Sequence, residues 1–89
     1  MENNDVAEAV YPCRFPVKVI GEDRKALEKG IIEVMSSLGE TIRPDGMTAT
    51  YSRNKKYVSI TFEIVATSRE YVDRMYSALN ARKEVKMVL

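Results

Sequence analysis

The sequence contains no histidine, no tryptophan and a single cysteine, Cys13, among its 89 residues. One cysteine can form neither an intrachain disulfide nor a cysteine-only metal site. Without histidine, the Ser-His and Cys-His pairs of nucleophilic catalysis are excluded. These absences predict a protein that is not an enzyme and carries no cofactor or metal, and Cys13 is best interpreted as a small hydrophobic residue.

Long apolar runs are also missing. No stretch is long enough to cross a bilayer and no secretory signal pattern opens the chain, so we expect a cytoplasmic protein without a membrane segment. The net charge is +1, and without the three acidic residues of the first ten it becomes 14 − 10, or +4. This mildly basic balance lies below the large excess that is typical of dedicated nucleic-acid binders.

The chain divides into a short leader and one domain. Residues 1–10 have few large apolar side chains and no clear period, which predicts a flexible lead-in. Residues 11–89 suffice for a single small domain with a limited core.

Four stretches read as β-strands: 15–20, 47–53, 57–66 and 84–89. The third is the clearest, because Val58, Ile60 and Phe62 alternate with polar residues and predict one buried face. Pro16 lacks the N–H that a ladder uses, so we expect it near the start of the paired region.

The final stretch, EVKMVL, carries apolar residues up to its last position, Leu89. Strict alternation predicts that Val85, Met87 and Leu89 face the core, while Lys86 and Val88 face the opposite side of the sheet.

Two further stretches have the period of an amphipathic helix, 22–39 and 67–80. We expect Asp23 to cap the start of the first and Gly39 to follow its end. For the second we expect a capping box that begins at Thr67, and a left-handed Asn80 at its end.

The resulting order, β-α-β-β-α-β, predicts an α+β fold of the ferredoxin-like type. Two right-handed crossovers and one hairpin give a four-stranded antiparallel sheet of order 4-1-3-2 with both helices on one face.

Three stretches, YPCRFPVKVIG, YVSITFEIVAT and VKMVL, resemble the YbeD-like family of small bacterial proteins of unknown function. The resemblance covers residues 11–89. It implies a ferredoxin-like fold similar to the ACT domain, a regulatory module that binds amino acids, and it suggests an association with lipoate metabolism. In the ACT motif Asp-Arg-Pro-Gly-Leu, Asp23 and Arg24 match, whereas Lys25 and Ala26 replace the proline and glycine, and the close backbone approach that glycine permits is lost.

Charged and aromatic residues at the loops and on the predicted open face form a candidate interaction surface. Arg14, Lys18 and Lys86 are expected to form a basic patch on neighbouring strands, and a second basic group lies at the hairpin. The full set is Arg14, Lys18, Asp23, Arg24, Arg53, Lys55, Lys56, Tyr57 and Lys86.

These observations favour a stand-alone regulatory or adaptor domain that acts through a protein partner or a small ligand. The two edge strands have few charges to deter pairing, so homodimerisation through an edge is feasible. The alternative is a weak RNA-binding module that uses the basic hairpin and the open face. Only Tyr57 could stack on a base there, and Glu63 would repel phosphate, so nucleic-acid binding is the less favoured hypothesis.

Overall fold

A computed structural model describes residues 10–89. Apart from the exposed Val10, the predicted lead-in therefore lies outside the described residues. The elements follow the predicted order: β1 (Cys13–Gly21), α1 (Arg24–Ser37), the short 3-10 helix η1 (Pro44–Gly46), β2 (Thr48–Tyr51), β3 (Val58–Ala66), α2 (Arg69–Asn80) and β4 (Met87–Val88).

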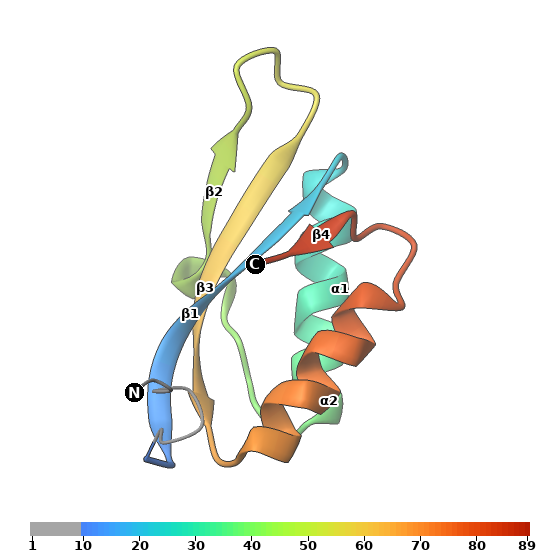
Figure 1. Ribbon diagram of the computed structural model, residues 1–89. Coiled ribbons are helices and arrows are strands. Elements are labelled where there is room, and N and C mark those ends of the chain that lie inside the picture. Colours follow the sequence, from blue (N-terminus) through green and yellow to red (C-terminus); the bar gives the residue numbers. More distant parts are fainter. Residues whose placement is uncertain (1–9) are drawn as a thin grey trace, which may run out of the picture.

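The four strands form one antiparallel sheet of order β2-β3-β1-β4, which is the predicted order 4-1-3-2 counted from the other edge. Both helices lie on the same side of this sheet (Figure 1). The ferredoxin-like prediction is therefore confirmed.

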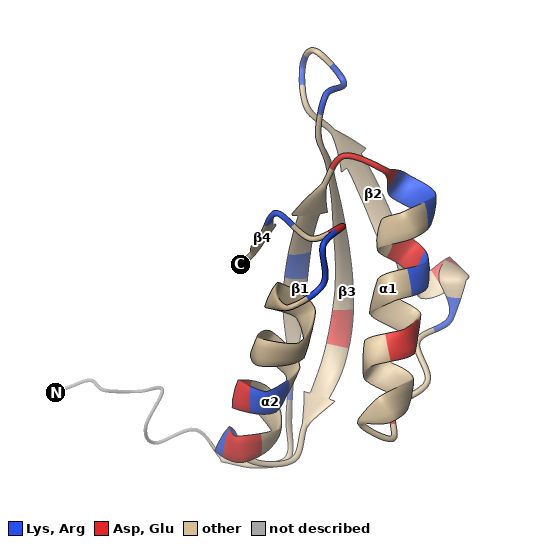
Figure 2. Cartoon of the chain, turned by 90° about the vertical axis from the view of Figure 1, so that its right-hand side faces the viewer, with Lys and Arg blue, Asp and Glu red and all other residues tan. Residues whose placement is uncertain are grey.

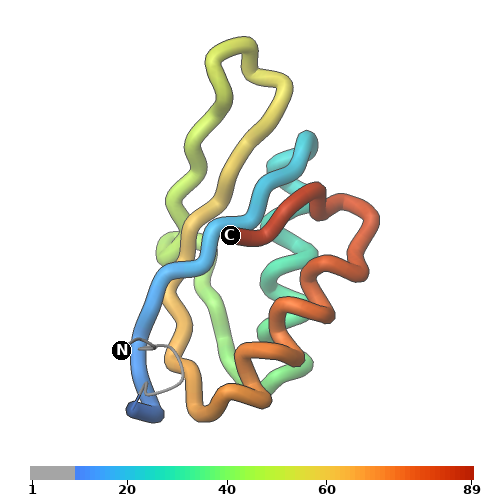
Figure 3. The backbone as a smooth tube through the Cα atoms, viewed as in Figure 1, coloured from blue at the N-terminus to red at the C-terminus, as the bar shows by residue number. Residues whose placement is uncertain are grey.

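The strands are very unequal in length. β1 and β3 pair along their full nine residues, from Cys13 opposite Ala66 to Gly21 opposite Val58. β2 covers only residues 58–61 of β3, and β4 pairs only with Val19 and Ile20 of β1. Both short strands flank the same end of the central pair, and Figure 3 shows the other end extending beyond them. Half of the sheet is thus only two strands wide among the residues described.

The core lies between the sheet and the helices. Val17, Val19, Ile60, Phe62 and Ile64 point from the central strands to the helices and are at most 1% exposed. From the helices come Leu27, Ile31, Val34, Met35, Met75 and Leu79. The predicted core members Phe15, Val72 and Val85 are half-buried against this cluster.

The helix ends follow the predicted chemistry in part. Asp23 caps α1 by accepting from the Ala26 amide at 3.1 Å, as predicted. Gly39 has φ +87°, and the Glu40 amide beyond it donates to the Met35 carbonyl, which completes a Schellman motif.

The second helix differs from prediction at both ends. Ser68, not Thr67, is the N-cap of α2, because its hydroxyl accepts from the Tyr71 amide at 3.0 Å. Asn80 is not left-handed. Its side-chain amide donates instead to the Tyr76 carbonyl, one turn back in the helix, at 2.9 Å.

The predicted position of Pro16 was wrong. Pairing of β1 begins three residues earlier, at Cys13, and Pro16 lies within the strand opposite Glu63. The backbone groups of Lys18 point toward β4, since Lys18 exchanges two hydrogen bonds with Leu89. By alternation the nitrogen of Pro16 faces the same side, beyond the end of β4, so no ladder bond is lost there.

The predicted phase of the last stretch was right for Val85, which packs against the core, and wrong for Met87, Val88 and Leu89. Val88 pairs with the fully buried Val19 and packs against the core, whereas Met87 and Leu89 are 51% and 58% exposed. The cause is the turn before β4, in which the Val85 amide donates to the Arg82 carbonyl. Val85 and Val88 both reach the core three residues apart, so the segment does not keep a strict two-residue period.

Candidate functional site

The nine predicted interaction residues lie at three separate places and do not form one surface. Asp23 and Arg24 are at the start of α1, where Asp23 caps the helix and Arg24 pairs with Glu28 at 3.0 Å. The Glu28 carboxylate is also the main reason that the pKa of Arg24 is raised. Both residues thus have local structural partners, a helix amide for Asp23 and a carboxylate for Arg24.

The second place is the tip of the β2–β3 hairpin, residues 52–57 (Figure 2). Lys55 adopts a left-handed backbone with φ 61°, and Ser52 closes the loop by accepting from the Tyr57 amide at 3.0 Å. The ammonium group of Lys56 lies 5.5 Å from the centre of the Tyr57 ring. Together with Arg53, these residues form a compact basic tip whose one aromatic ring already has a cation beside it.

The third place is the open face of the sheet, where the predicted basic patch is not continuous. Arg14 lies 3.4 Å from the carboxylate of Glu63, and both side chains are mostly exposed. Lys18 is four residues further along β1, roughly 13 Å away at the rise of a strand. Apolar Met87 and Leu89 lie opposite Ile20 and Lys18. The face is thus mixed in character, with charge compensated at the Arg14 end.

Lys86 does not extend this patch in the predicted way. It precedes β4, and its backbone amide donates to the Ile20 carbonyl at 2.8 Å. The residues that this segment presents on the open face are Met87 and Leu89, because their neighbour Val88 faces the helices.

A groove of about 430 Å³ lies beside the half of β3 that β2 leaves uncovered. One wall is the connection between α1 and β2, which contributes Glu40, Ile42 and Arg43. The other wall is the outer edge of β3 at Glu63 and Val65. Sequence reasoning missed this groove, because it depends on how far β2 extends along β3.

Glu40 joins the two sides of the groove. Its carboxylate accepts a hydrogen bond from the Tyr71 hydroxyl of α2 at 2.5 Å and one from the Val65 amide at 3.3 Å. Burial and the Glu40 contact raise the pKa of Tyr71, which keeps the phenol protonated and donating. Glu40 is 25 residues from Val65 and 31 from Tyr71, and no local pattern links positions so far apart.

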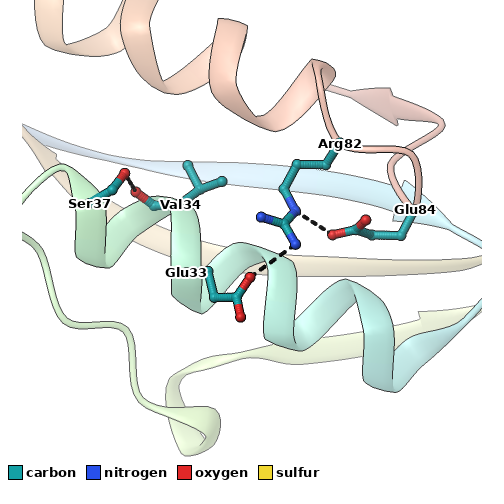
Figure 4. Close-up of polar contacts among 5 residues, drawn as sticks. All are labelled: Glu33, Val34, Ser37, Arg82 and Glu84. Atoms are coloured by element: carbon teal, nitrogen blue, oxygen red, sulfur yellow. Dashed lines mark hydrogen bonds and ion pairs between the residues drawn. The ribbon is translucent and has the colours of Figure 1, made fainter.

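A second polar cluster ties the helices together at the other end of the domain (Figure 4). The guanidinium of Arg82 lies 2.5 Å from Glu84 and 3.0 Å from Glu33 of α1. The Glu84 side chain is only 14% exposed, and its bond with Arg82 holds the pKa of the carboxyl below its usual value. Gly30 faces this pair, and a Cβ there would overlap the Glu84 carboxylate. The cluster therefore has a clear structural role.

Neither cluster has the composition of a metal centre. Across residues 10–89, no group of three or more His, Cys, Asp or Glu residues could hold an ion. Cys13 is half-buried against the core. In the same range, no helix combines the length and apolar character needed to cross a bilayer.

Comparison with known proteins identifies the family. Residues 7–89 match the model of a family described as "Protein of unknown function (DUF493)". The chain belongs to the DUF493 family. Its relatives in this family include a UPF0250 protein of Nitrosomonas europaea, which is 32% identical over 79 residues that cover 89% of this chain and 91% of the relative. A UPF0250 protein of Hahella chejuensis is 33% identical over 89% of this chain and 87% of the relative.

Solved structures agree on the fold. The solution structure of protein HP0495 from H. pylori superposes with a TM-score of 0.73 at 15% identity, and covers 91% of this chain and 85% of that protein. An uncharacterised protein, TM1266 from Thermotoga maritima, gives a TM-score of 0.57 at 14% identity over 85% of this chain and 92% of its own. The match to the DUF493 family model and to the UPF0250 relatives confirms the resemblance to the YbeD-like proteins, and the family description states no activity.

Proposed function

We propose that this DUF493 protein is a non-catalytic adaptor or regulatory domain that works in the cytoplasm by binding another protein. The observation that carries the proposal is the two-stranded half of the sheet, where both central strands leave an outer edge uncovered within residues 10–89. Backbone groups at such an edge can pair with a further polypeptide, and proteins that do not use their edges generally protect them.

The side chains around the two-stranded half of the sheet favour a binding role over catalysis. The charged groups are engaged in pairs, Arg14 with Glu63 and Arg43 with Asp45, at 3.4 Å each. The remaining acid, Glu40, holds the Tyr71 hydroxyl and the Val65 amide. Burial and the Glu40 contact raise the pKa of Tyr71, so the phenol stays protonated and is poorly matched to general acid or base catalysis near neutral pH.

The proposal is tested with the purified full-length chain immobilised and exposed to lysate of a bacterium that encodes it. We expect one protein to be retained in stoichiometric amount and to bind again after separate purification, with a Kd that calorimetry can measure. Retention of a small molecule, with no protein that rebinds, would replace the adaptor by a ligand sensor. Turnover of a substrate by the purified chain would overturn the proposal.

RNA binding is the second candidate, because the structure gathers Arg53, Lys55, Lys56 and Tyr57 at one hairpin tip. Binding of a single-stranded RNA through these cations must weaken steeply between 50 and 200 mM salt, by about tenfold or more for several phosphate contacts. A triple variant, Arg53→Ala, Lys55→Ala and Lys56→Ala, would then lose most of the affinity. Binding that is insensitive to salt would exclude this candidate.

The suggested link to lipoate metabolism is a third, separate question about the pathway. Deleting the gene and measuring protein lipoylation by immunoblot would test it, and unchanged lipoylation would remove the link without affecting the adaptor proposal.

A further inference from the structure

The backbone groups of β3 that face the groove have a defined direction. Lys18 exchanges backbone hydrogen bonds with Leu89 on the β4 side. The backbone N–H and C=O of its neighbour Val17 therefore point the other way, toward Phe62 of β3. By alternation, the N–H and C=O groups of Glu63 and Val65 point to the outer edge, away from β1. The bond from the Val65 amide to Glu40 lies on that side and agrees with this assignment.

Most of these outward groups have no hydrogen-bond partner within residues 10–89. β2 pairs with β3 only as far as Thr61, and the Gly46 amide, which would come next in the ladder, donates to Arg43 instead. The Glu63 amide, the Glu63 carbonyl and the Val65 carbonyl therefore face the groove unpaired by the described chain. The Val65 amide is held by a side-chain carboxylate at 3.3 Å, a longer bond than strand pairing normally gives.

We propose that the outer edge of β3 from Glu63 to Val65, together with the groove beside it, binds an extended peptide segment of a partner protein, which adds there as a short strand. This inference rests on the proposed adaptor function and names its site. The occupant is a peptide and not a second copy of the chain. The uncovered edge spans only residues 62–66, between β2 with its preceding turn η1 and the connection to α2.

The charges of the groove select the kind of peptide. Arg14 and Arg43 are each paired with a carboxylate, whereas Glu40 contacts only the neutral Tyr71 hydroxyl and Val65 amide among the described residues. A strand that pairs with Val65 supplies its own carbonyl to that amide, and the Glu40 carboxylate then becomes available to a lysine or arginine of the peptide. Ile42 offers an apolar contact for an alternate side chain.

The test uses a display library of random heptapeptides selected on the full-length protein, followed by affinity measurement of individual peptides. Glu63→Pro removes the outward amide without removing a bond to β1, and Glu63→Gln is the matched control that keeps the backbone intact. We expect enrichment of peptides that contain lysine or arginine. Both variants lose the carboxylate that pairs with Arg14, and only Glu63→Pro loses the amide, so we expect Glu63→Pro to bind roughly tenfold more weakly than Glu63→Gln.

Mapping on the unmodified protein makes the test independent of whether Glu63→Pro folds. On addition of a selected peptide, NMR should show shifts at residues 62–66 and 40–43, and the amide of Glu63 should exchange more slowly with solvent. Absence of any enriched peptide, or shifts confined to the hairpin tip or to Met87 and Leu89, would overturn the inference. If a partner protein binds Glu63→Pro as well as it binds the unmodified chain, the adaptor function stands and the edge site fails.

Discussion

Replacing Gly21 by alanine should destabilise this small domain severely. Gly21 ends β1 beneath the connection that leads into β4 and is buried. A Cβ built on it lies 2.5 Å from the Glu84 carbonyl oxygen and 2.9 Å from Cδ1 of Leu27, where ordinary contacts begin at 3.4 Å. Because the nearer atom belongs to the backbone, rotating a side chain cannot relieve the overlap.

The size of the effect follows from this overlap. The Glu84 carbonyl must move by about 0.9 Å, the difference between 3.4 and 2.5 Å. That shift strains the neighbouring bond from the Lys86 amide to the Ile20 carbonyl, which fixes the entry of β4. Overpacking of this kind costs typically about 1–3 kcal/mol. We expect the upper part of that range, against a total stability of about 5–10 kcal/mol for a domain of this size.

Chemical denaturation followed by circular dichroism measures the effect, with Gly46→Ala as the matched control. A Cβ at Gly46 meets no atom within 4 Å, so this control should be neutral or slightly stabilising through the less flexible unfolded chain. Gly30→Ala should fall between the two, because the atoms it meets belong to the side chains of Glu84 and Arg82. A Gly21→Ala variant within about 0.5 kcal/mol of Gly46→Ala would refute the assigned packing of the β4 entry.

Four further predictions follow from the same structure. Val88→Ala should cost about 1 kcal/mol or more in unfolding free energy and Met87→Ala almost nothing. A larger loss for Met87→Ala than for Val88→Ala in chemical denaturation would instead support the strand phase that alternation predicted. Phe62→Ala, at a side chain 1% exposed, should cost about 3–5 kcal/mol, and an unchanged melting temperature would contradict its place in the core. Because the Arg82 contact lowers the pKa of Glu84, the ionised carboxylate stabilises the fold at pH values above the usual pKa near 4.5. This contribution is lost as the pH falls through the lower pKa of the folded state. The stability gap between the unmodified protein and Glu84→Gln should therefore be largest at neutral pH and should shrink in acid, whereas a constant gap would argue against the Arg82 contact as its cause. Edge pairing of two copies through β4 predicts a concentration-dependent dimer in sedimentation, and a monomer at high concentration would remove it.

The sequence by itself determined the order of the elements, the topology and most of the core. Val58, Ile60 and Phe62 sit in a strict two-residue alternation that permits only one buried face. Asp23 and Gly39 mark the ends of α1 by local chemistry, since a carboxylate that caps amides and a residue that accepts positive φ act within a few residues of chain. Signals that act over so few residues can be interpreted without knowledge of the rest of the fold.

The tertiary structure alone decided the phase of the last strand. Residues 85 and 87–89 are all apolar, so burial of either face was compatible with the pattern. The choice was made by the turn at Arg82 and by the pairing of Val88 with Val19, which are long-range contacts. Hydrophobic periodicity specifies register strongly only where polar residues exclude the other face.

The candidate binding edge was likewise beyond the sequence. It exists because β2 begins only at Thr48, opposite Thr61, while β3 continues to Ala66, and because Glu40 reaches Val65 from a distant loop. The sequence indicated roughly where both strands begin and end, but not that the loop carrying Glu40 lies along the uncovered part of β3. The physical reason is that free backbone groups and paired charges acquire a common location only when separate segments fold against one another.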